Sequence, residues 1–223
     1  NECFGFTKDE TEELLKYYDL ELTDDVKKMY DGYNFCGTEI YNPWSILNYA
    51  DDRVLQEYWI NTSGNELILR CIKNSTDNVK VVIEKLLTGE SVDFIYDDKV
   101  TYLDYNNLES INNILNLLFA SGYLTMDKKY INEFGREKTL VKLPNEEVKN
   151  LFNKILYEIL ITDYKINDKS LENLCSGLLN NNKELIEKNL NEILPNMSYM
   201  DSSESFYHGY LLGIFSEFLN NKY

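Results

Sequence analysis

Hydrophobic residues recur at helical spacing along most of the chain, and cap signals mark where several predicted helices begin. Residues 7–10 have the spacing of a capping box, and apolar positions on one helical face follow them. A second helix is predicted over residues 24–30. Asn42 and Pro43 are typical of the N-cap and first position of a helix, here over residues 44–49. This first region is therefore predicted to consist of short helices joined by aromatic loops.

The pattern changes after about residue 64, where helical stripes alternate with short β-prone runs. Gly89 and Gly122 each follow a helical stripe, as glycines that end helices do. In chain order, the sequence predicts a helix over residues 78–87, a strand over 92–95, a helix over 108–118, strands over 123–126 and 139–143, and a helix from Pro144. Helix, strand, helix and hairpin is the order of a winged-helix domain, which we predict for residues 65–160.

The remainder, residues 161–223, is predicted to be helical. We expect helices over residues 169–179, over 183–194 with its end at Pro195, and over 203–219. The last of these is apolar on nearly all sides, which is typical of a helix buried by several neighbours. We therefore expect it to self-associate or to leave its final turns frayed.

Composition limits the functions that this chain can have. Its 223 residues are 43% hydrophobic, enough for a real core, and its net charge of −16 makes it a poor non-specific binder of nucleic acid. Most of the excess negative charge lies in residues 1–64, with 14 acidic and 5 basic side chains. No apolar run approaches a membrane span and no secretory signal is present, which favours the cytoplasm.

Complete catalytic and cofactor motifs are missing from the sequence. No glycine-rich phosphate loop occurs, and His208 is the one histidine available to a catalytic set. The four cysteines lie far apart without metal-ligand spacing, so no metal site is predicted. We expect no cofactor in this chain and no catalysis by the chain alone.

Aromatic residues gather in an aromatic patch early in the chain. Its members are Tyr30, Asp31, Tyr33, Tyr41 and Trp44. Aromatic faces can hold an adenine ring or a partner's side chain, but they also form small cores under loops. Both interpretations stay open at this point.

Two further candidate sites are a nucleic-acid contact on the predicted hairpin and a single carboxylate near the C-terminus. The predicted recognition helix, residues 107–121, has no Lys or Arg, whereas the hairpin after it carries Lys128, Lys129 and Lys138 among its basic residues. A solvated hairpin is favoured over DNA contact there. Glu204 lies on the apolar C-terminal helix, where it is either a first-turn residue facing the helix dipole or one part of a larger site.

Seven short segments follow one another in an order that is specific when they are taken together. They are Phe4-Gly5-Phe6-Thr7, Tyr30-Asp31-Gly32-Tyr33-Asn34-Phe35, Tyr41-Asn42-Pro43-Trp44-Ser45, Asn61-Thr62-Ser63-Gly64-Asn65, Ser121-Gly122-Tyr123-Leu124-Thr125, Leu143-Pro144-Asn145-Glu146-Glu147-Val148, and residues 204–213. The first four resemble the region after the nucleotide-binding core of the predicted AAA-ATPase-like proteins. The next two resemble their winged-helix region, and the last resembles the first helix of their C-terminal PD-(D/E)XK nuclease-like domain.

The resemblance implies a longer protein that uses ATP and Mg²⁺. Family members have an upstream P-loop and Walker B acid, and a downstream Asp and Glu-x-Lys; this sequence has neither set. Glu204 alone matches a nuclease position, and one carboxylate cannot hold a hydrolytic Mg²⁺. The partners implied are therefore the nucleotide-binding and nuclease-like parts of the same protein.

Together, these observations predict a mainly α chain with three parts: a lid-like helical bundle over residues 1–64, a winged-helix domain with a small β-hairpin over 65–160, and C-terminal helices over 161–223 that lead into a nuclease-like domain. The predicted role is to couple an ATPase module to a nuclease-like one without catalysis. Two alternatives remain: an interaction adaptor that uses the aromatic patch around Trp44, and a nucleic-acid binder that uses the basic hairpin.

Overall fold

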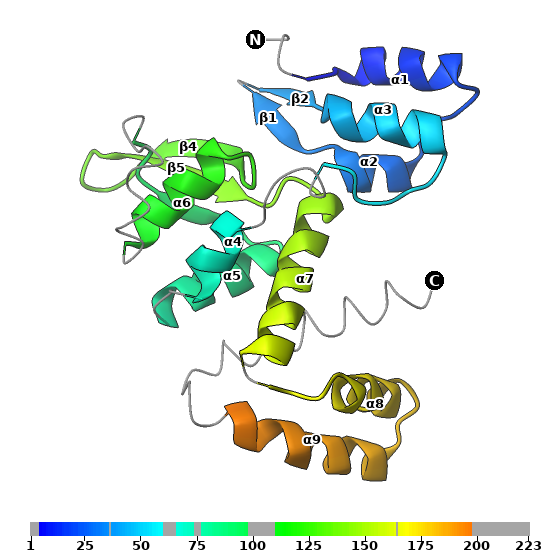
Figure 1. Cartoon of the computed structure of the whole chain (residues 1–223). Coiled ribbons are helices and arrows are strands. Elements are labelled where there is room, and N and C mark those ends of the chain that lie inside the picture. Colours follow the sequence, from blue (N-terminus) through cyan, green and yellow to red (C-terminus); the bar gives the residue numbers. More distant parts are fainter. Residues whose placement is uncertain are drawn as a thin grey trace.

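The computed structural model describes residues 5–35, 37–59, 66–73, 77–97, 110–163 and 165–197. Within these ranges the protein is mainly helical and contains two small antiparallel sheets, which confirms the predicted fold class at that level. The helix predicted over residues 203–219, its expected self-association and the candidate Glu204 lie outside the described residues. Figure 1 shows the arrangement of the elements.

The N-terminal unit consists of three helices and one small hairpin. Its elements are α1 (Lys8–Tyr17), α2 (Asp24–Tyr30), β1 (Tyr33–Phe35), β2 (Thr38–Ile40) and α3 (Pro43–Asp52). The predicted caps are confirmed: Thr7 and Glu10 form a capping box before α1, and the Asn42 side chain caps α3 ahead of Pro43. The hairpin was not predicted, because strands of three residues are too short to show alternation.

The central unit combines four helices with a three-stranded sheet. Its elements are α4 (Glu66–Lys73), α5 (Asp77–Leu87), β3 (Val92–Phe94), α6 (Ile111–Ala120), β4 (Thr125–Ile131), β5 (Glu137–Lys142) and α7 (Glu146–Thr162). The strand order is β3-β5-β4, and both pairings are antiparallel. The predicted order of helix, strand, helix and hairpin is therefore present. The α4 helix was not predicted.

Two further helices, α8 (Asp168–Leu179) and α9 (Lys183–Met197), pack against each other after α7. The prediction that Pro195 ends the last of them was wrong, since α9 continues to Met197. A proline removes one backbone donor and crowds the carbonyl four residues earlier. The helix nevertheless runs two residues beyond Pro195, which lies in its last turn.

Buried side chains form two hydrophobic cores. The N-terminal core gathers residues from all three helices of its unit and ends at Tyr58. The central core extends from Ile68 on α4 to Ile193 on α9, and Trp59 packs against it. The chain therefore leaves one core and reaches the other between two adjacent residues, Tyr58 and Trp59.

The two units also touch where β1 lies against the central unit. The Asn34 amide donates to Thr125 Oγ1 at 2.8 Å, and the Tyr33 hydroxyl donates to the Gly122 carbonyl at 3.1 Å. Gly32, with φ of +106°, is so close to the residues before α7 that an added Cβ would lie 1.8 Å from the Pro144 carbonyl oxygen. A glycine is required here both for the backbone angle and for the close approach.

We predict that Gly32→Ala lowers the free energy of unfolding by about 3 kcal/mol or more, because backbone atoms must move apart to admit the methyl group. Gly37→Ala is the matched control: Gly37 has φ of +91° with no atom within 4 Å of an added Cβ, so only the backbone angle is penalised. That control should cost about 1–2 kcal/mol. Urea unfolding followed by circular dichroism measures both; equal losses would contradict the close approach.

Candidate functional site

Glu147 lies at the start of α7 with its side chain between the two cores. Asn145 caps this helix by accepting a hydrogen bond from the Val148 amide at 3.1 Å, which places Glu147 in the first helical turn. The positive end of the helix dipole favours a carboxylate at this position. Glu147 nevertheless has only 1% of its surface exposed, which is unusual for a glutamate.

Three donors from the N-terminal side satisfy the Glu147 carboxylate. Oε1 accepts from the backbone amides of Tyr58 at 2.6 Å and Trp59 at 2.7 Å, and Oε2 accepts from Ser45 Oγ at 2.8 Å. Ser45 belongs to α3 and is itself fully buried. One side chain of α7 thus holds α3 and the two residues at which the chain passes between the cores. We call this set, Glu147 with Ser45, Tyr58 and Trp59, the Glu147 clamp.

Two opposing effects act on the ionisation of Glu147. Burial raises the pKa of Glu147, and repulsion from Glu57 adds to this, while the three hydrogen bonds of the clamp lower it; burial has the larger effect. Truncating this side chain would leave buried donors without an acceptor, a costly arrangement. The clamp therefore stabilises the fold only when all of its hydrogen bonds are formed, and losing one partner destabilises the others.

Glu57 provides a second, more exposed link to α7. Its carboxylate accepts from Asn150 Nδ2 at 3.0 Å and pairs with Lys154 Nζ at 3.1 Å. Residues 57–59 are thus fixed to α7 over successive turns. Exposed ion pairs stabilise little on their own, so this link adds orientation more than energy.

Four of the seven segments singled out in the sequence meet where the N-terminal unit contacts the central unit. We call this contact region the seam. Residues 30–35 supply Gly32, Tyr33 and Asn34, and residues 41–45 supply Ser45. Residues 121–125 provide the acceptors for Tyr33 and Asn34, and residues 143–148 provide Pro144 and Glu147. Segments that are far apart in the sequence thus form one set of contacts, which gives them a shared structural role.

The predicted aromatic patch does not form one surface. Tyr30 and Tyr41 are buried in the N-terminal core, where the Tyr30 hydroxyl donates to the Gln56 carbonyl at 2.7 Å. Tyr33 points toward the central unit, and the Asp31 carboxylate accepts from the Gly32 amide at 2.6 Å. Trp44 is 51% exposed on α3. Of the five residues, Trp44 alone therefore offers an open aromatic face.

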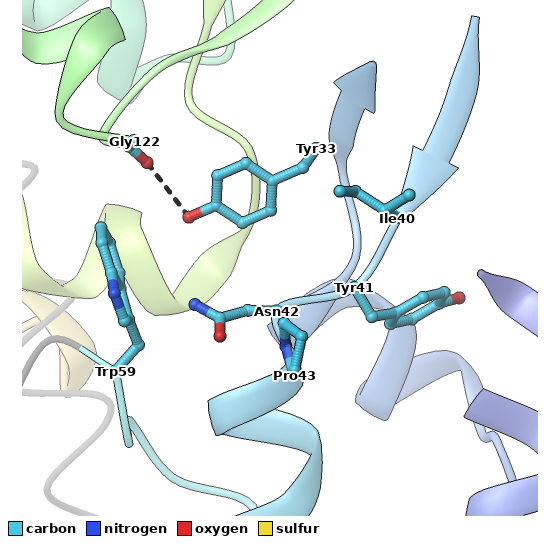
Figure 2. A pocket seen from close by; sticks show the side chains of 7 residues that line it. All are labelled: Tyr33, Ile40, Tyr41, Asn42, Pro43, Trp59 and Gly122. Atoms are coloured by element: carbon cyan, nitrogen blue, oxygen red, sulfur yellow. Dashed lines mark hydrogen bonds between the residues drawn. The ribbon is translucent and has the colours of Figure 1, made fainter. Parts of the chain in front are cut away.

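A cavity of about 190 Å³ opens at the seam beside the clamp (Figure 2). Its lining residues come from both units: Tyr33, Ile40, Tyr41, Asn42, Pro43, Trp59 and Gly122. Two members of the aromatic patch line it, but Trp44 does not. Trp59 was not predicted as a site residue, because it lies in an irregular segment without a periodic pattern.

The basic hairpin β4–β5 carries the three candidate nucleic-acid contacts. Lys129 pairs with Glu137 at 2.8 Å and Lys138 with Asp93 at 2.9 Å, whereas Lys128 is exposed on β4. Two of the three lysines are thus neutralised by neighbouring carboxylates. This arrangement resembles a solvated hairpin more than a phosphate-binding surface.

The described residues contain no group of three or more His, Cys, Asp or Glu side chains that could hold a metal ion. Burial raises the pKa of Cys71 to about 12, and Cys175 is fully buried, so neither thiol is suited to nucleophilic chemistry. In the part of the chain that the structure covers, no helix has the length and apolar character of a membrane span.

Comparisons with known proteins find a distant relative. The chain is 23% identical over 134 residues to an uncharacterized protein in the vnfD 5′ region of Azotobacter chroococcum mcd 1. The alignment covers 60% of this chain but only 23% of that protein, so the chain spans a small part of the relative's length. No family model matches the chain, and no solved structure matches it.

We predict that Glu147→Ala lowers the free energy of unfolding by about 3 kcal/mol, because two amides and a hydroxyl lose their buried acceptor. Glu146→Ala is the matched control: this neighbouring residue is exposed and forms a 3.5 Å ion pair with Lys149, so the loss should stay within about 0.5 kcal/mol. Urea unfolding of both variants tests the difference. Similar losses for the two variants would show that the clamp contributes no more to the free energy of unfolding than an exposed ion pair.

Proposed function

We propose that this chain is the non-catalytic coupling portion of a longer AAA-ATPase-like protein with a PD-(D/E)XK nuclease-like domain. In this proposal the N-terminal unit is the lid-like region after the nucleotide-binding core, and the central unit is the winged helix. The role of the chain is to pass a movement of the ATPase side to the nuclease-like side. The observation that carries this proposal is the Glu147 clamp.

The clamp supports coupling because it ties the two cores at the point where the chain crosses between them. If the crossing at Tyr58 and Trp59 were a free linker, the units could reorient independently. Instead, both amides are fixed to Glu147, and Gly32 lies in close contact with Pro144. A force on the N-terminal unit would therefore act directly on the first turn of α7.

The α7 helix is suited to carry such a displacement further. Its 17 residues span about 25 Å at the usual rise of a helix. Its first turn lies beside the N-terminal unit and its last turn leads to α8 and α9 (Figure 1). Residues of α7, α8 and α9 share the central core, which makes these helices one packed body.

The length of the similar Azotobacter protein agrees with a role inside a larger chain. The alignment covers 23% of that protein, which leaves room for further domains. Its printed name gives no activity, so the ATPase and nuclease parts of the proposal rest on the resemblance of the seven segments. The reading frame that encodes this chain provides a first check: it should contain a P-loop upstream and an Asp with Glu-x-Lys downstream.

An interaction adaptor is the second candidate, because Trp44 and Leu47 are exposed on the same helix, by 51% and 44%. Positions three apart share a face, so they form a small apolar surface on α3. A Trp44→Ala, Leu47→Ala double variant that keeps its stability but abolishes function would favour the adaptor. The coupling proposal expects that variant to remain active.

The coupling proposal predicts the behaviour of the whole encoded protein when Glu147 is replaced by alanine. ATP should no longer stimulate nuclease activity, while ATP hydrolysis and unstimulated DNA cleavage should remain near the wild-type rates. The reason is that each catalytic part keeps its own residues and only the connection is weakened. Rates of ATP hydrolysis and of cleavage with and without ATP, measured at a temperature where the variant is folded, test this.

Glu146→Ala serves as the control and should keep full stimulation. Loss of both activities in the Glu147 variant would indicate general unfolding, and a near-native circular dichroism spectrum at the assay temperature excludes that cause. Undiminished stimulation in a folded Glu147 variant would contradict the proposal. So would a reading frame without the two missing motifs.

A further inference from the structure

The cavity beside the clamp has features of a small binding site that the coupling role does not use. It lies between Tyr33 on β1 and Trp59 (Figure 2). Pro43 and Ile40 add further apolar surface, and Gly122 approaches Trp59, since an added Cβ would be 3.6 Å from the indole ring. Its size suits a single ring rather than a large molecule.

Several polar atoms around this cavity are used by the protein itself. The Tyr33 hydroxyl donates to the Gly122 carbonyl at 3.1 Å, and the Tyr41 carbonyl accepts from the Phe6 amide at 3.1 Å. The backbone carbonyl of Asn42 accepts from the Ile46 amide at 3.1 Å. Each of these groups is engaged within the fold.

Asn42 Nδ2 differs from these groups. Its companion atom Oδ1 accepts from the Trp44 amide at 3.0 Å as the cap of α3, which fixes which end of the side chain is the donor. The Nδ2 group then faces the space between Tyr33 and Trp59 (Figure 2). Among the described residues no hydrogen bond from Nδ2 to an acceptor is present, so this donor is available to a ligand.

We propose that this cavity binds a proline of an extended peptide, with the carbonyl before the proline accepting from Asn42 Nδ2. A proline ring is compact and apolar and has no N–H to satisfy, which matches a site with aromatic walls and the Asn42 donor. Proline-rich segments are also extended before binding and lose little conformational entropy. This proposal stands independently of the coupling role.

Charge argues against a nucleotide as the occupant and for a peptide with a basic flank. Residues 1–64, which supply every lining residue except Gly122, carry 14 acidic and 5 basic side chains. Burial raises the pKa of the Tyr33 hydroxyl, and the negative charge of Glu147 adds to this effect. This excess of negative charge in the region that forms most of the cavity disfavours phosphate groups and favours a lysine beside the proline.

Trp59 gives a direct optical test, because the chain has two tryptophans and Trp44 does not line the cavity. In a Trp44→Phe background, a short capped oligoproline peptide that ends in one lysine should change the Trp59 fluorescence in a saturable way. A capped peptide of alternating glycine and serine, with the same length and the same terminal lysine, should not. In the wild-type protein, the side-chain amide resonances of Asn42 should shift with the same dependence on the concentration of the oligoproline peptide.

Asn42→Asp is the matched variant, since it keeps the cap oxygen of α3 but replaces the donor with an acceptor. We expect it to weaken binding of the oligoproline peptide at least about tenfold without changing the helical circular dichroism. If that variant does not fold, Asn42→Ser removes the same donor and also keeps a cap oxygen. Equal binding by the variant, equal binding of the glycine–serine peptide, or no saturable change at millimolar peptide would each overturn the proposal.

Discussion

The structure depends on one buried carboxylate that receives backbone hydrogen bonds from both sides of a core boundary. Tyr58 is the last residue of the N-terminal core and Trp59 packs against the central one, yet Glu147 Oε1 accepts from both of their amides. A buried charge is tolerated only when its hydrogen-bonding capacity is met. Glu147 can be buried only while its three hydrogen bonds are formed. These hydrogen bonds therefore fix the positions of α3, Tyr58, Trp59 and α7 relative to one another.

Other features of the seam follow from this fixed geometry. With the first turn of α7 held against α3, the residue before β1 lies so close to Pro144 that only a glycine fits at position 32. The same placement brings Tyr33 and Trp59 to opposite sides of a cavity that Asn42 Nδ2 faces. Coupling and peptide binding are separate proposals, but both depend on the clamp because it positions the residues that each one uses.

The parts of the fold that could be predicted from the sequence are those decided by neighbouring residues. The caps at Thr7 and Asn42 and the helix ends near Gly89 and Gly122 are of this kind, and the structure confirms them. The helix predicted from Pro144 begins two residues later, at Glu146, with Asn145 as its cap. The β1–β2 hairpin and α4 could not be predicted, because they are short and depend on tertiary packing. Glu147 was recognised only as part of a helix start, because no local pattern reveals that donors from far earlier in the chain converge on it.

The most direct test of the clamp is native-state hydrogen exchange of the Tyr58 and Trp59 amides. Both lie outside helices and strands, so without the clamp they would exchange as quickly as loop amides. We predict protection close to that of the Phe152 amide inside α7 in the wild-type protein, and a selective loss at both residues in Glu147→Ala. Rapid exchange of these two amides in the wild-type protein, at rates like those of Gly37, would contradict the account.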